Sequence, residues 1–177
     1  MREIEITEDC LNFIDQQEEK TKLKIFYLIE IIGEIKIVNS NFLKKLQSTQ
    51  FYELRVKTGK EIRIIIFAVD HLNFAECKKA VMGKSVNARE LISARYGEKG
   101  SKEREQFREE AFSYYFGEVI RNRRKELGMS QEGLADKIGK KRPYISRIEK
   151  GEDIKLSNFA LLANALGLTI ELKAEEV

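Results

Sequence analysis

In the first third of the chain some segments have hydrophobic residues at the spacing of strands and others have them at the spacing of helices. A short strand is predicted over residues 2–6, where Ile4 and Ile6 alternate with polar residues, and Thr7 is suited to cap the helix that follows. Over residues 18–32 the apolar positions recur every three or four residues, which predicts an amphipathic helix that ends at Gly33. A short helical piece is predicted over residues 42–46.

The spacing then changes to a period of two, which is typical of half-buried strands. Strands are predicted over residues 51–57, 61–69 and 74–81, with turn residues between them. Successive strands joined by tight turns form an antiparallel meander, and the preceding helices are needed to cover one of its faces. Residues 1–81 are therefore predicted to form an α+β domain.

A transitional segment, residues 82–103, separates this domain from the rest of the chain. It contains a predicted short helix over residues 88–96 and a linker of glycine, serine and charged residues over 97–101. Helical patterns dominate from Lys102 onward, so a second domain is predicted over residues 104–177.

The second domain is predicted to be all-α with a short strand at its end. Ser101 is suited to cap a long helix that Gly117 interrupts and Gly128 ends. Further helices are predicted over residues 131–138, 143–149 and 158–166, the last of them capped by Ser157. Residues 168–172 alternate as a strand does, and the free edge of a terminal strand invites a second chain.

Composition narrows the class of protein. Hydrophobic residues make up 42% and charged residues 34% of the chain, a balance typical of soluble globular proteins. The apolar runs are far shorter than the roughly 20 residues that a bilayer span needs, and the N-terminus has no signal-like apolar segment, so a cytoplasmic protein is expected. Cys10 and Cys77 have neither metal-ligand nor redox spacing, so neither a metal site nor a cofactor is expected.

Charge is informative through its distribution. The net charge of +3 is too small to indicate a polyanionic partner by itself. However, five basic residues and no acidic residue occur between Lys137 and Arg147. Such a run is often only a solvated surface, so its meaning depends on the elements that carry it.

Those elements are two short helices around a glycine-containing turn, predicted for residues 130–151. Leu134 and Ala135 on the first helix can pack against Ile145 and Ile148 on the second, and alanine is small where two helices approach closely. This is helix-turn-helix geometry, in which the second helix enters the major groove of DNA with its N-terminal residues at the base edges. The basic residues concentrate at that end of the second helix, where the helix dipole also attracts phosphate.

Four motifs in this region follow one another with a gap-free spacing. They are Met129-Ser130-Gln131, Leu134-Ala135, Ile145-Ser146-Arg147-Ile148-Glu149-Lys150-Gly151 and Leu162-Ala163-Asn164-Ala165-Leu166-Gly167. Through these motifs residues 116–167 resemble the Xre/lambda-repressor-type helix-turn-helix family. Residues 88–110 are similar to the N-terminal region of HigA-type antitoxins.

The resemblance implies that six residues contact DNA: Gln131, Lys141, Arg142, Tyr144, Arg147 and Lys155. Gln131 would contact phosphate and support the recognition helix, and Lys155 would touch the DNA backbone. Arg142 and Arg147 are candidates for bidentate contacts to guanine. Pro143 stands where many relatives carry a base-reading polar side chain, so the resemblance does not extend to the DNA sequence that is read. The alternative is that these are surface residues of a fold that binds only protein.

Three motifs in the N-terminal domain resemble the RelE/HigB-type mRNA-interferase toxins: Phe42-Leu43-Lys44-Lys45-Leu46, Phe51-Tyr52-Glu53-Leu54-Arg55-Val56 and Ile62-Arg63-Ile64-Ile65-Ile66-Phe67-Ala68. The resemblance implies that Arg63 stabilises charge on a reacting phosphate and that Arg55 and Lys45 bind RNA. In relatives the last strand continues into a segment with further catalytic groups, whereas here it ends near Val81. This departure indicates a truncated toxin-type domain fused to its antitoxin. The alternative is that Lys45, Arg55 and Arg63 serve only folding or contacts with the antitoxin part.

Taken together, the sequence predicts a DNA-binding autorepressor of a toxin–antitoxin type system, bound to the operator of its own promoter as a homodimer. The alternative is an mRNA-cleaving toxin domain, in contact with mRNA or the ribosome, that its own antitoxin domain holds inactive, so enzymatic activity stays open. A third possibility is an interaction module whose terminal strand recruits a separately encoded toxin.

Overall fold

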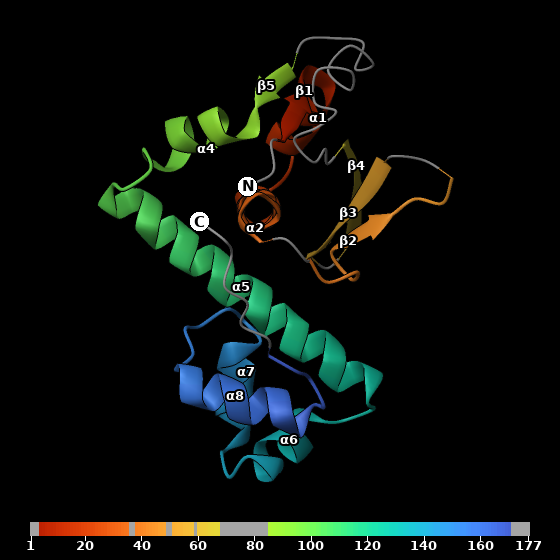
Figure 1. Ribbon diagram of the computed structural model, residues 1–177, viewed down its shortest axis with the longest axis vertical. Helices are drawn as coiled ribbons and strands as arrows, with labels where there is room; N and C mark the ends of the chain where they lie inside the picture. The colour runs from red at the N-terminus through yellow and green to blue at the C-terminus, as the bar shows by residue number, and fades with distance from the viewer. Residues whose placement is uncertain (1–3, 36–37, 49–50, 59, 68–84, 171–177) are drawn as a thin grey trace, which may run out of the picture. The chain divides into compact units, whose positions relative to one another are not determined.

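The protein has a mixed α+β fold that divides into two compact units, residues 1–112 and 113–177 (Figure 1). The computed structural model describes residues 4–35, 38–48, 51–58, 60–67 and 85–170. The border between the units falls inside the long helix α5 (Lys102–Glu126), so each unit is described by itself.

After a short strand, β1 (Glu5–Thr7), the first unit continues with two helices, as predicted. Helix α1 (Glu8–Asp15) follows Thr7, whose side-chain oxygen accepts a hydrogen bond from the Cys10 amide at 3.3 Å and so caps the helix. Helix α2 (Glu19–Glu34) is buried along most of its length. The predicted stop at Gly33 is wrong, because the helix includes this residue. A glycine ends a helix by adopting the left-handed conformation, and Gly33 has no positive φ.

A three-stranded antiparallel sheet has the order β2-β3-β4 (Leu43–Lys45, Phe51–Thr58 and Lys60–Phe67). The predicted hairpin of β3 and β4 is confirmed, and Leu54 in its centre is register partner of both Leu43 and Ile64. The helical piece predicted over residues 42–46 is wrong, because pairing with β3 satisfies the backbone of β2 and overrides the local preference. The third strand predicted over residues 74–81 lies outside the described residues.

A second, two-stranded sheet brings distant parts of the chain together. Strand β1 (Glu5–Thr7) pairs antiparallel with β5 (Ser85–Asn87), with Ile6 opposite Val86. Helix α4 (Ala88–Tyr96) then starts after Asn87, whose side chain accepts a hydrogen bond from the Arg89 amide at 2.9 Å. Helix α4 contacts α2, so this helix packs onto the N-terminal elements of the first unit.

Helix α5 starts after Ser101, whose Oγ accepts a hydrogen bond from the Arg104 amide at 3.2 Å. It runs for 25 residues without a break, so the predicted interruption at Gly117 is wrong. Gly117 serves a close approach instead: a Cβ atom there would collide with the carbonyl oxygen of Ile148. As predicted, Gly128 ends the helix, with φ +66°.

The second unit adds three short helices, α6 (Gln131–Lys137), α7 (Arg142–Ile148) and α8 (Leu156–Ala165). Helix α8 starts at Leu156, so the predicted cap at Ser157 is wrong, and Lys155 takes the capping position. The predicted terminal strand is not formed over residues 168–170, because the Leu168 amide bonds to the Ala163 carbonyl at 2.8 Å and closes the end of α8. Residues 171–172 lie outside the described residues. Within the described ranges, no helix is both long and apolar enough to cross a membrane.

Candidate nucleic-acid interface

Helices α6 and α7 are joined by a tight turn of four residues, 138–141. Ser130 caps α6 by accepting a hydrogen bond from the Gly133 amide at 2.9 Å. In the turn Gly139 adopts a φ of +64°, which favours glycine, and the Lys140 amide bonds back to the Ala135 carbonyl at 2.9 Å. The local sequence therefore forms a helix-turn-helix.

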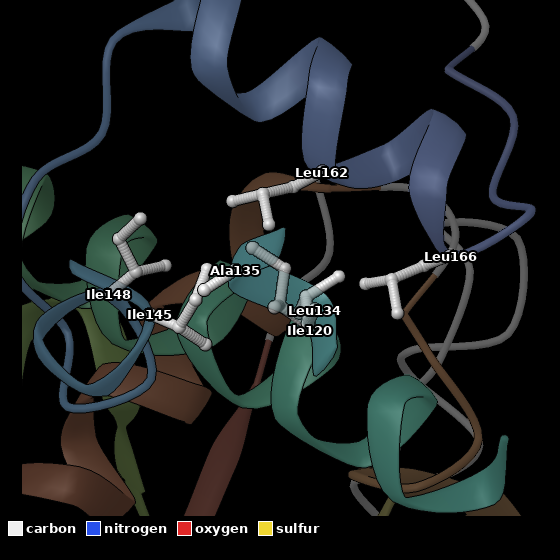
Figure 2. Packing of buried hydrophobic residues seen from close by; sticks show 7 residues of the cluster. All are labelled: Ile120, Leu134, Ala135, Ile145, Ile148, Leu162 and Leu166. Carbon is white, nitrogen blue, oxygen red and sulfur yellow. The ribbon is translucent and has the colours of Figure 1, made fainter. Parts of the chain in front are cut away.

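One hydrophobic cluster holds the helix-turn-helix together (Figure 2). Its buried members come from α5 to α8 and the residue after α8: Ile120, Leu134, Ala135, Ile145, Ile148, Leu162 and Leu166. Ile145 and Ile148 place one side of α7 in this core, and Leu162 and Leu166 close it from the other side (Figure 2). The predicted packing of the two helices is confirmed, and the opposite side of α7 is left to solvent.

That solvent-facing side of α7 and the turn before it are basic. Arg142 and Arg147 of α7 are exposed, as are Lys140 and Lys141 in the turn. Lys137, the last residue of α6, is exposed as well. The Arg147 guanidinium lies 3.5 Å from the Glu152 carboxylate, but both side chains are more than half exposed, so the pair is weak. The structure thus brings three of the sequence-predicted residues onto one accessible surface. The exposed Lys155 lies beyond α7, at the start of α8.

Tyr144 sits between this surface and the core. It is half-buried against the hydrophobic cluster, and burial raises the pKa of its hydroxyl above the usual value. Its side chain hydrogen-bonds to Asn158, and the Lys140 ammonium lies 5.7 Å from the centre of its ring. Tyr144 therefore links α7 to α8 at the edge of the basic surface.

Gln131 belongs to a buried polar network that fixes the C-terminal end of α7. The Gln131 side-chain amide donates to Glu149 Oε2 at 2.9 Å. Glu149 also accepts two hydrogen bonds from Arg124 of α5, at 2.5 and 2.9 Å, and Arg124 donates a third to the Met129 carbonyl at 2.6 Å. Arg124 and Glu149 are 8% and 6% exposed, so their charges are withdrawn from water and paired. The network joins α5, α6 and α7.

Sequence reasoning missed the part played by Arg124. The available signal is its position, four residues after the buried Ile120 on the same face of α5. A charged residue on the apolar stripe of a helix needs a buried partner. Glu149, within the family-like motif, supplies it from 25 residues away.

The three candidates in the first unit do not form one cluster. Arg55 and Arg63 are register partners in β3 and β4. Lys45 is opposite Tyr52, which lies three residues before Arg55 in β3 and therefore on the other face of the sheet. Arg55 is already paired with Glu53 at 2.6 Å. Two of the predicted residues therefore meet across the ladder, and the third lies on the other face.

Comparison with known proteins supports the C-terminal assignment. Residues 120–173 match a family model of the Xre-like helix-turn-helix, which includes α6, α7, α8 and the end of α5. No curated protein matches the chain. The C-terminal unit therefore contains a DNA-binding helix-turn-helix domain. In the described part of the chain, no group of three or more His, Cys, Asp or Glu side chains is arranged to hold a metal ion.

Proposed function

We propose that the protein is a sequence-specific transcriptional regulator that represses its own promoter as a homodimer, in a toxin–antitoxin type system. The observation that carries the DNA-binding part is the exposed basic face of α7 within a helix-turn-helix whose other face is fixed in the core. The toxin–antitoxin context rests on the sequence resemblances of residues 42–68 and 88–110.

In this proposal Arg142 and Arg147 read guanine edges, and Lys141 and Lys155 contact phosphates. Tyr144 contributes at the edge of the same surface. Gln131 has a second amide hydrogen besides the one given to Glu149, and that hydrogen is available for a phosphate oxygen. The buried network thus orients a phosphate ligand.

The test is binding of the purified full chain to its own upstream DNA, followed by fluorescence anisotropy at several salt concentrations. We expect Arg142→Ala and Arg147→Ala each to weaken binding roughly 5- to 150-fold, since a bidentate contact is worth about 1–3 kcal/mol. Affinity of the unchanged protein falls steeply with salt, because phosphate contacts release counterions. Lys102→Ala removes an equal charge from an exposed residue of the first unit and is the matched control. If Arg142→Ala and Arg147→Ala bind the DNA as tightly as Lys102→Ala does, α7 is not the helix that reads DNA.

A second candidate function is RNA cleavage by the first unit, held inactive by the second. It is supported by the sequence resemblance of residues 42–68, and the register of β3 and β4 places two of the residues that this resemblance assigns to RNA, Arg55 and Arg63, opposite each other. Expression of residues 1–112, the first compact unit, would then arrest growth, and Arg63→Ala would abolish the arrest. A folded but harmless fragment argues against this function.

A further inference from the structure

The solvent-facing side of α8 carries no charge. It is formed by five exposed residues: Leu156, Ser157, Ala160, Leu161 and Asn164. Leu156 and Leu161 are 79% and 50% exposed, although leucine is most often buried. The other side of the helix faces the core, and the side chains of Leu162 and Leu166 are buried there (Figure 2).

This face departs from what a surface helix normally shows. The exposed side of such a helix usually carries charged residues, and 34% of this chain is charged. Yet the ten residues of α8 include neither an acidic nor a basic side chain. The centre of a protein–protein interface has this composition, with apolar side chains and few charged residues.

We propose that a second copy of this chain docks on this face, so that α8 packs against α8 across a two-fold axis. In such an isologous contact the residues close to the two-fold axis lie near their own counterparts, so a charge at the centre of the contact would meet a like charge. A face without charge avoids this repulsion. Ser157 and Ala160 are small enough for two helices to approach, while Leu156 and Leu161 supply apolar area at the flanks.

The inference rests on the proposed homodimer and names its contact surface. The ten residues of α8 extend over about 15 Å. One helix of this length is too short to bury the about 800 Å² per partner that is typical of a stable interface. Ile170, which is 44% exposed, adds apolar surface just beyond the helix. We therefore expect a weak dimer whose population depends on concentration in the micromolar range and hardly on salt.

Sedimentation equilibrium of the full chain without DNA tests this surface. Ser157→Glu and Leu161→Glu each place a charge on the face, and each is expected to raise the dimer dissociation constant at least tenfold. Ser157 lies in the first turn of α8, where a carboxylate favours the helix, so this variant keeps its fold. Leu127→Glu, at a leucine that is 41% exposed in the turn after α5, is the control and leaves dimerisation unchanged. Circular dichroism verifies that all three variants are folded.

Two results would overturn the inference. A chain that stays monomeric at all concentrations shows that no second copy docks on α8. A dimer that both glutamate variants leave intact is formed by another surface. Failure of the DNA-binding proposal is separate, because a dimer that α8 variants break but that ignores its upstream DNA supports the surface and contradicts the regulator.

Discussion

The ion pair of Arg124 and Glu149 allows a quantitative test of how the recognition helix is held. Both side chains are almost fully buried and are joined by hydrogen bonds of 2.5 and 2.9 Å. The Arg124→Met variant keeps the length of the side chain but leaves the Glu149 carboxylate with the Gln131 amide as its remaining partner in the network. Removing one partner of a buried pair costs about 3–5 kcal/mol. The second unit is therefore expected to lose a large part of its stability.

The double variant Arg124→Met/Glu149→Leu separates the pair from its surroundings. Replacing both charges by apolar side chains removes the uncompensated charge, so it is expected to cost clearly less than the sum of the two single variants. A residual loss remains, since the Met129 carbonyl and the Gln131 amide each lose a partner worth about 1 kcal/mol.

Hydrogen exchange of the slowest amides in α6, α7 and α8 measures this loss, because it reports opening of the second unit alone. A loss of 3–5 kcal/mol accelerates their exchange roughly 100- to 4,000-fold. Glu126→Gln is the control: its pair with Arg123, at 3.2 Å, reaches solvent and is worth less than about 1 kcal/mol. If Arg124→Met exchanges no faster than this control, or if the single effects simply add in the double variant, the pair does not fix α7 as described.

Two further predictions concern glycine and cysteine. Gly33→Ala in α2 meets nothing within 4 Å and is expected to stabilise the protein by about 0.5–1 kcal/mol, whereas Gly117→Ala drives a methyl group into the Ile148 carbonyl and is expected to destabilise it by about 1–3 kcal/mol. Denaturant unfolding measures the change in the free energy of unfolding for both variants. If Gly117→Ala stabilises the protein as Gly33→Ala does, α5 and α7 do not approach as closely as described. Burial raises the pKa of the Cys10 thiol, so less thiolate is present near neutral pH. In a Cys77→Ser background its reaction with a disulfide reagent at pH 7.5 is expected to be slower than in urea and to accelerate as the pH rises; equal rates in both solvents would show that the thiol is not shielded.

Much of the second unit could be predicted because its local signals agree with its packing. Ser130 caps α6, and Gly128 takes the left-handed conformation that ends α5. One stretch in each unit shows where such signals fail. Residues 42–46 have a helical pattern, but pairing of β2 with β3 decides their structure. Gly117 looks like a break, and only the carbonyl of a residue 31 positions later explains why a glycine stands inside a continuous helix.

The candidate site divides in the same way. The exposure of Arg142 and Arg147 follows from the helical period that buries Ile145 and Ile148, so the sequence was sufficient to predict it. The partner of Arg124 could not be predicted, because the pair joins separate helices and its geometry depends on how they pack. The contacts of all these residues with DNA stay a prediction.

The anchoring of α7 also bears on the thermodynamics of DNA recognition. At its C-terminal end the helix is fixed by the Glu149 network and by the close contact of the Ile148 carbonyl with Gly117. A helix that is rigid before its ligand arrives loses little backbone entropy on binding. Calorimetry of complex formation is therefore expected to give a heat-capacity change in proportion to the surface removed from water, without the larger contribution that folding upon binding adds.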